Sequence, residues 1–113
     1  MTRRKDVSGY KSMWLFVIFD LPVDTKPARR HYREFHNFLL EKGFSQIQYS
    51  VYARFFASEQ RAQPHRQAIG WAVPPDGHVR LFSLTDIQFA AMQSYYGKKR
   101  QEPEKKPAQM RLF

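Results

Sequence analysis

The sequence predicts an α+β domain of the ferredoxin-like type, a βαββαβ sandwich in which an antiparallel sheet carries its helices on one face. Three observations predict this fold class. Met13–Phe19 is continuously apolar and rich in β-branched and aromatic residues, as a strand buried on both faces is. Thr25–Lys42 carries apolar residues at helical spacing, and Ser45–Phe56 alternates apolar with more polar residues. A chain of 113 residues suits one domain.

The first helix has clear start and stop signals. Pro22 ends the strand before it, Thr25 can cap the helix, and Pro27 suits its first turn. Gly43 suits the left-handed conformation that stops a helix. One apolar stripe runs along the helix, formed by Ala28, Tyr32, Phe35 and Leu39.

We interpret Ser45–Phe56 as a long strand with two usable faces. The odd positions from Ile47 to Phe55 make the more apolar face, and Tyr52 and Phe56 lie on the other. The chain offers no cover for the second side of the sheet, and aromatic residues on an uncovered sheet usually meet a partner. A symmetric homodimer, packed sheet against sheet, is the simplest arrangement.

Weaker signals mark the second half of the chain. Ala62–Ala72 is expected to be a helix, with Pro64 tolerated only in its first turn. The turn sequence Pro74–Gly77 separates it from a strand over Val79–Leu84. Two short elements then follow, a helical turn with capping-box spacing at Thr85–Gln88 and a strand at Met92–Tyr96.

Four segments make up the chain in this interpretation. Residues 1–12 form a basic N-terminal arm, and residues 13–97 form the ferredoxin-like domain. Residues 98–107 are charged and contain proline without apolar residues, which is typical of a flexible linker. Residues 108–113 turn apolar again, and we expect them to form a C-terminal strand at a sheet edge of this chain or of a partner.

The charge of the chain favours a polyanionic partner. The formal net charge is +9 and the isoelectric point is about 10.1, which for a small α/β domain points to nucleic acid. A solvated basic surface is the alternative. A membrane is not expected, because no basic helix has the apolar face needed to insert and no run approaches ~20 apolar residues.

The composition also bears on the cellular compartment. The absence of cysteine excludes disulfides and thiolate metal sites, which fits a cytoplasmic protein. The apolar run near the N-terminus is short and lacks a small-residue cleavage site, so a signal peptide is not expected.

Basic residues are spread along the chain rather than gathered in one block. Such spacing suits phosphate contacts along a duplex. For any single arginine a solvated face is the better interpretation, whereas the set as a whole favours phosphate binding. No recognition-helix pattern is present, so sequence-specific binding is not implied. The candidate nucleic-acid-binding residues are Arg29, Arg30, Arg33, Arg54, Lys98, Lys99 and Arg100.

Asp20 is the candidate for chemistry, because it follows the buried strand and is therefore held at the rim of the sheet. Hard cations such as Mg²⁺ prefer such carboxylate oxygens. One carboxylate is a poor metal site, but two-fold symmetry could supply a second. The alternative is a turn cap, since Asp-Leu-Pro is itself a turn sequence. Zinc sites, nucleophile elbows and phosphate-binding glycine loops have no matching pattern.

Several motifs together resemble one family. They are FDLP at 19–22, the basic helix, GFSQIQYSVYARF at 43–55, the PPDG turn before VRLFSLT, and TDIQFAAM at 85–92. The chain is similar over nearly its whole length to the CRISPR-associated protein two family, the small subunit of the spacer-acquisition complex. The resemblance is to the versions found in systems with a single large effector nuclease.

This resemblance implies a ferredoxin-like homodimer in which Asp20 matches the metal-binding aspartate, with Mg²⁺ as the ion shared by two copies. It implies a dimer that bridges the CRISPR-associated integrase and holds prespacer duplex DNA. Members are also described as metal-dependent endonucleases on RNA or DNA, which would make Asp20 catalytic. The family's C-terminal strand often pairs with a partner, which assigns partner docking to Gln109, Met110, Arg111, Leu112 and Phe113.

Three departures from the family's pattern weaken the nuclease hypothesis. The basic positions early in the first helix match Arg29 and Arg30 only approximately. Some members have arginine where this chain has Gln46, and others have phenylalanine where it has Tyr52. Three hypotheses therefore stand: a DNA-binding scaffold, a Mg²⁺-dependent phosphodiesterase, and a toxin-like endoribonuclease of the same fold without an integrase partner.

Overall fold

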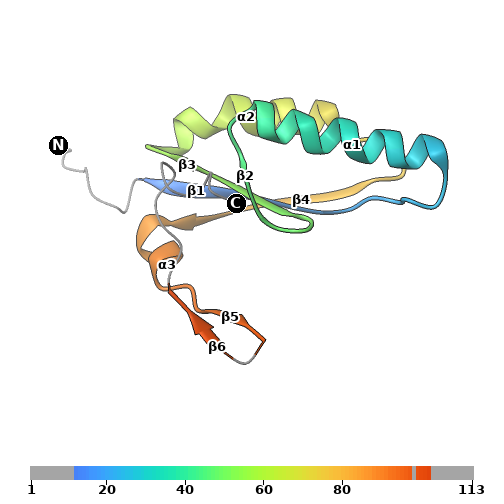
Figure 1. Cartoon of the computed structure of the whole chain (residues 1–113). Coiled ribbons are helices and arrows are strands. Elements are labelled where there is room, and N and C mark those ends of the chain that lie inside the picture. Colours follow the sequence, from blue (N-terminus) through green and yellow to red (C-terminus); the bar gives the residue numbers. More distant parts are fainter. Residues whose placement is uncertain (1–11, 98, 103–113) are drawn as a thin grey trace.

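The computed structural model describes residues 12–97 and 99–102, and these form two layers with a small appendage (Figure 1). The predicted α+β, ferredoxin-like fold is confirmed. Its elements are β1 Met13–Asp20, α1 Lys26–Glu41, β2 Ser45–Gln48, β3 Val51–Phe56, α2 Glu59–Ala72 and β4 His78–Thr85. The appendage consists of α3 Asp86–Ala90, β5 Ser94–Tyr96 and β6 Lys99–Gln101.

The main sheet is antiparallel with strand order β2-β3-β1-β4. The most apolar strand, β1, lies inside the sheet because side chains on both of its faces are buried. Helices α1 and α2 lie on one face (Figure 1). None of the helices in the described part of the chain is long and apolar enough to cross a membrane.

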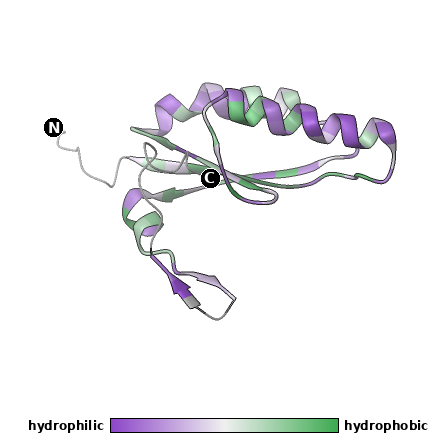
Figure 2. Cartoon of the chain, in the orientation of Figure 1, coloured by the Kyte–Doolittle hydropathy of each residue, from purple (hydrophilic) through white to green (hydrophobic). Residues whose placement is uncertain are grey.

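Alternation along β1 divides the core into two parts. The helix-side core joins Leu15 and Val17 to Phe35 and Leu39 of α1 and to Ile69 of α2. Figure 2 shows the complementary pattern, with hydrophilic residues along much of α1 and in β6. The opposite side of the sheet, called here the open face, carries a smaller cluster formed by Trp14, Phe16, Ala53 and Phe89.

The open face is partly covered by the chain itself, which corrects the expectation of no cover. Thr85 and Gln88 form a capping box that begins α3 where β4 ends. Helix α3 places Phe89 against Trp14, with ring centroids 3.8 Å apart, and Trp14 Nε1 donates to Asp86 Oδ1 at 3.1 Å.

The interpretation of Ser45–Phe56 as one strand is wrong, because the chain reverses at residues 49–50 and forms the β2–β3 hairpin. An alternating pattern reports which side each residue faces but not whether the chain has turned between them. The assignment of the sides also changes: Tyr52 and Phe56 lie under the helices, 0% and 5% exposed.

The start of the second helix differs from the prediction. Helix α2 begins at Glu59, three residues before Ala62, because Ser58 caps it by accepting from Arg61 N at 3.3 Å. Pro64 consequently lies inside the helix rather than in its first turn.

The end of the described chain forms a separate hairpin. Strand β5 pairs with β6 and not with the main sheet, so residues 99–101 of the predicted linker form a strand. Most of the predicted basic arm and the predicted C-terminal strand 108–113 lie outside the described residues, as does residue 98.

Candidate nucleic-acid and metal site

Asp20 is the last residue of β1 and its side chain is exposed. It shares the open face with Phe16 and Ile18, because residues two apart on a strand point to one side. Its neighbour Phe19 points the other way and is buried under the helices. Across the sheet Asp20 stands directly opposite His78, the first residue of β4.

Two surface hollows meet at Asp20. The first is about 220 Å³ and crosses the sheet, with Ile18 and Val51 as its apolar lining. The second is about 600 Å³ and extends toward Tyr32 and Tyr49. Both are lined by Phe19, Asp20, Ser50 and His78.

Hydrogen bonds and stacked rings hold the β2–β3 turn beside these hollows. Phe19 N donates to Ser50 O at 3.2 Å, which ties the β2–β3 turn to the end of β1. Tyr32 donates its hydroxyl to Tyr49 O at 3.4 Å, and the two rings stack with centroids 5.7 Å apart. Helix α1 is thereby joined to the same turn.

Tyr32 and Tyr52 remain protonated at neutral pH. Burial raises the pKa of Tyr32 above its ordinary value, with the hydrogen bond to Tyr49 as a second cause. Burial also raises the pKa of Tyr52 to about 12. Their hydroxyl groups are therefore donors and not anionic ligands.

The metal donors that one chain supplies are few. Within residues 12–97 and 99–102, no group of three or more histidine, aspartate or glutamate side chains could hold a metal ion. An exposed carboxylate at a strand end suits Mg²⁺ as one oxygen ligand among several. Asp20 therefore fits a metal only as part of a site completed from outside this chain.

The three predicted arginines of α1 are exposed but line neither hollow. Arg29 Nη1 donates to Val23 O at 3.1 Å and so holds the loop before the helix. Arg30 and Arg33 have no side-chain hydrogen bond or ion pair to any described residue. These two side chains are consequently available to an external anion.

The guanidinium of Arg54, by contrast, has partners within the chain. Its Nη1 atom donates to Lys42 O at 2.6 Å and lies 2.8 Å from His65 Nε2. The guanidinium also lies over the Phe56 ring, 4.7 Å from its centroid. Arg54 thus closes the end of α1 against α2, and it is not presented to phosphates as Arg30 and Arg33 are.

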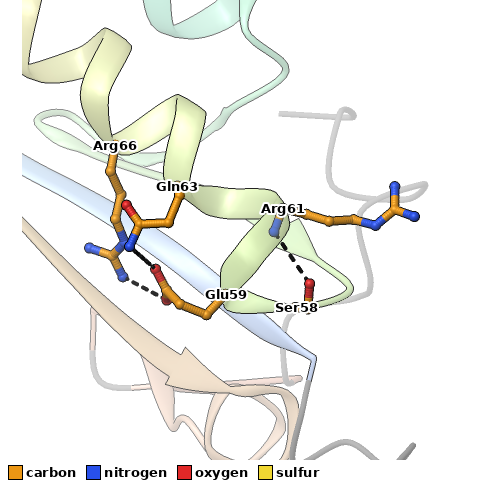
Figure 3. Close-up of polar contacts among 5 residues, drawn as sticks. All are labelled: Ser58, Glu59, Arg61, Gln63 and Arg66. Carbon is orange, nitrogen blue, oxygen red and sulfur yellow. Dashed lines mark hydrogen bonds and ion pairs between the residues drawn. The ribbon is translucent and has the colours of Figure 1, made fainter.

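Two arginines near the start of α2 differ in their surroundings: Arg66 lies beside Glu59, whereas Arg61 points away from it (Figure 3). Glu59 accepts from Arg66 at 2.7 and 3.1 Å and from Gln63 at 3.3 Å. Arg61 extends away from this group. The charge of Arg66 is therefore balanced locally, whereas Arg61 has no ion pair with any residue that the structure describes.

The remaining predicted residues are described only in part. Arg100 is exposed on β6, in the hairpin that extends away from the main sheet (Figure 1). Lys99 belongs to the same strand, whereas Lys98 lies outside the described residues. Gln109, Met110, Arg111, Leu112 and Phe113 also lie outside them.

Two further residues lie beside Asp20 and were not predicted from the sequence. His78 and Arg80 are both exposed and both line the smaller hollow. The alternation of β4 could have identified them, because Val79 and Leu81 pack in the helix-side core. The intervening residues must face the other side, which is the side of Asp20.

Comparison with known proteins agrees with this architecture. The family model described as CRISPR associated protein Cas2 matches residues 13–92. The chain is 46% identical over 101 residues to the CRISPR-associated endoribonuclease Cas2 of Parvibaculum lavamentivorans, covering 89% of this chain and 100% of that protein.

Two further relatives carry the same name. The protein of Flavobacterium psychrophilum is 41% identical over 107 residues, covering 95% of this chain and 93% of that protein. The protein of Paracidovorax avenae is 40% identical over 107 residues, covering 95% and 99% respectively. The similarity therefore spans almost the whole of each chain.

Proposed function

Because this chain belongs to the CRISPR-associated protein Cas2 family, we propose that it acts in CRISPR adaptation as a homodimer that binds prespacer duplex DNA and bridges the integrase. The observation that carries the proposal is the exposed pair Arg30 and Arg33 on α1, without an acidic partner among the described residues. Unpaired cations on a rigid helix suit phosphate contacts that do not depend on sequence.

The open face supports the homodimer. Phe82 is 40% exposed there, and its ring stacks on Phe16 with centroids 5.0 Å apart. Phe55 and Leu84 lie on the same side, only partly buried. A second copy packed on this face would remove these aromatic and aliphatic surfaces from water.

Duplex binding tests the proposal. Replacing Arg30 and Arg33 by glutamine should weaken binding and flatten its dependence on salt by about one unit of slope per lost phosphate contact. Arg66→Gln is the matched control, because Glu59 already balances that charge. Equal losses in the double variant and in the control would contradict the assignment to α1.

Integrase docking through residues 109–113 stays a prediction. Deleting Gln109–Phe113 should abolish co-purification with the integrase while leaving duplex binding intact. Normal assembly of the truncated chain would contradict the docking role.

A second candidate is a Mg²⁺-dependent phosphodiesterase, favoured by the exposure of Asp20 between two hollows. Mg²⁺ would polarise the scissile phosphate and activate water. Asp20 carboxylates from two copies would hold the ion, and the apolar floor at Ile18 and Val51 would limit the water around the phosphate.

Cleavage assays test this candidate on short RNA and duplex DNA. Asp20→Asn preserves size but removes the charge, so it should abolish cleavage, as a chelator should. Cleavage that survives both changes would exclude the Asp20 metal site. Full cleavage of RNA by a dimer that never binds the integrase would favour the toxin-like endoribonuclease.

A further inference from the structure

Strand β4 brings a positively charged side chain next to Asp20. Ile18 and Arg80 are directly opposite each other in the β1–β4 register, as are Asp20 and His78. Directly opposite residues have Cβ atoms about 4.5–5.5 Å apart and point to the same face. Arg80, His78 and Asp20 therefore lie together on the open face, at one end of the sheet.

The smaller hollow combines these groups with an apolar floor. Its lining includes Ile18 and Val51 together with Ser50, Asp20, His78 and Arg80. Neither Arg80 nor Asp20 has a side-chain hydrogen bond or ion pair within the described ranges 12–97 and 99–102. The guanidinium donors of Arg80 are thus available to a ligand that enters the hollow.

The geometry points to a phosphate subsite, in which Arg80 and His78 bind one backbone phosphate of a nucleic acid beside Asp20. The inference deepens the phosphodiesterase proposed above and rests on its placement of the reaction at Asp20. Arginine binds two non-bridging phosphate oxygens at once through its planar fork. The imidazole ring of His78 adds an N–H donor.

The strand makes these donors a rigid pair. Residues 78 and 80 are two positions apart on β4, which separates their Cα atoms by about 6.8 Å along an antiparallel strand. The main chain at both positions is paired with β1, so the side chains start from fixed points. The predicted arginines of α1 do not line this hollow and cannot replace Arg80 there.

The test measures binding of a short RNA by the full-length protein in the presence of chelator, so that no metal-dependent cleavage occurs. Single methylphosphonates are placed in turn along the RNA, each removing one phosphate charge. For the wild type, one position should weaken binding about tenfold or more, as expected for loss of a charged hydrogen bond. In Arg80→Gln, a methylphosphonate at the same position should weaken RNA binding by less than about twofold, because the arginine that contacts this phosphate is already absent.

His78→Gln keeps a donor and should retain most of that sensitivity, whereas His78→Ala should lose part of it. Arg66→Gln is the matched control and should show the full wild-type pattern, because its charge is balanced by Glu59 outside the hollow. The subsite would be overturned if, in Arg80→Gln, a methylphosphonate at every position weakened RNA binding by the same factor as in the wild type. It would also be overturned if Arg66→Gln reduced the sensitivity to the critical methylphosphonate as strongly as Arg80→Gln does.

The subsite and the phosphodiesterase can fail separately. Suppose that wild-type protein with Mg²⁺ cleaves neither RNA nor DNA, while Arg80→Gln removes the sensitivity to one methylphosphonate. The proposed activity is then wrong and the phosphate subsite stands. If cleavage depends on Asp20 but Arg80→Gln keeps the wild-type sensitivity to every methylphosphonate, the activity stands and the subsite is wrong. In that second case Arg80 would contact the second copy of the dimer or only solvent.

Discussion

Arg54 on β3 and His65 on α2 meet with 2.8 Å between Nη1 and Nε2. Because the guanidinium can only donate, the imidazole Nε2 must accept, and the contact requires a neutral His65. Burial lowers the pKa of His65 below its ordinary value, and the charge of Arg54 lowers it further. The pair therefore joins the sheet to α2 only while the histidine is unprotonated.

This relationship predicts a loss of stability in mild acid. The unfolded chain binds a proton at His65 at a higher pH than the folded chain does, so the free energy of unfolding falls as pH drops through about 6.5. The stabilisation is fully present above that pH. Thermal unfolding between about pH 7.5 and about pH 5 should show a steeper fall in Tm for the wild type than for His65→Gln.

His31→Gln is the control for this experiment, since it removes a histidine from α1 and not from the Arg54 contact. Identical Tm profiles for the wild type and His65→Gln would contradict the mechanism.

Helix α3 should be a stabilising part of the domain. Phe89 is 2% exposed and stacks on Trp14, which is fully buried. Replacing Phe89 by alanine should lower the free energy of unfolding by about 3–5 kcal/mol, through lost burial and the cavity it leaves. Urea denaturation followed by tryptophan fluorescence measures this loss.

Ile87→Ala in the same helix is the comparison, because Ile87 is 68% exposed and its removal should change stability by less than about 0.5 kcal/mol. Similar effects of the two substitutions would show that α3 does not pack as described.

Phe82 should control self-association. It is the partly exposed aromatic residue of β4 on the open face, which a second copy is proposed to cover. Phe82→Glu should shift the protein toward monomer in analytical ultracentrifugation, because a charge buried in that interface would be unpaired.

Trp71→Glu provides the matched control, since Trp71 is 90% exposed on α2, in the layer on the other side of the sheet. Unchanged association of Phe82→Glu, or equal dissociation of the Trp71 variant, would place the interface elsewhere.

Local signals were sufficient where one segment determines its own structure. The start of α1 at its Thr25 cap, the buried strand β1 and the capping box of α3 could all be predicted from neighbouring residues. The β2–β3 turn could not, because the alternation of side chains continues across it. The predicted position of Tyr52 on the uncovered side of the sheet was part of the same error, since the residue lies under the helices.

Asp20 and the open face illustrate the difference most directly. The sequence by itself determined that a carboxylate ends a buried strand, that the chain is strongly basic, and that the fold is α+β. Only the tertiary structure decided which partners these groups have: Arg54 turns inward to Lys42 and His65, while Arg80 lies beside Asp20. The reason is physical. Periodicity gives the side to which a residue points, but only strand register and helix packing bring residues distant in the sequence into contact.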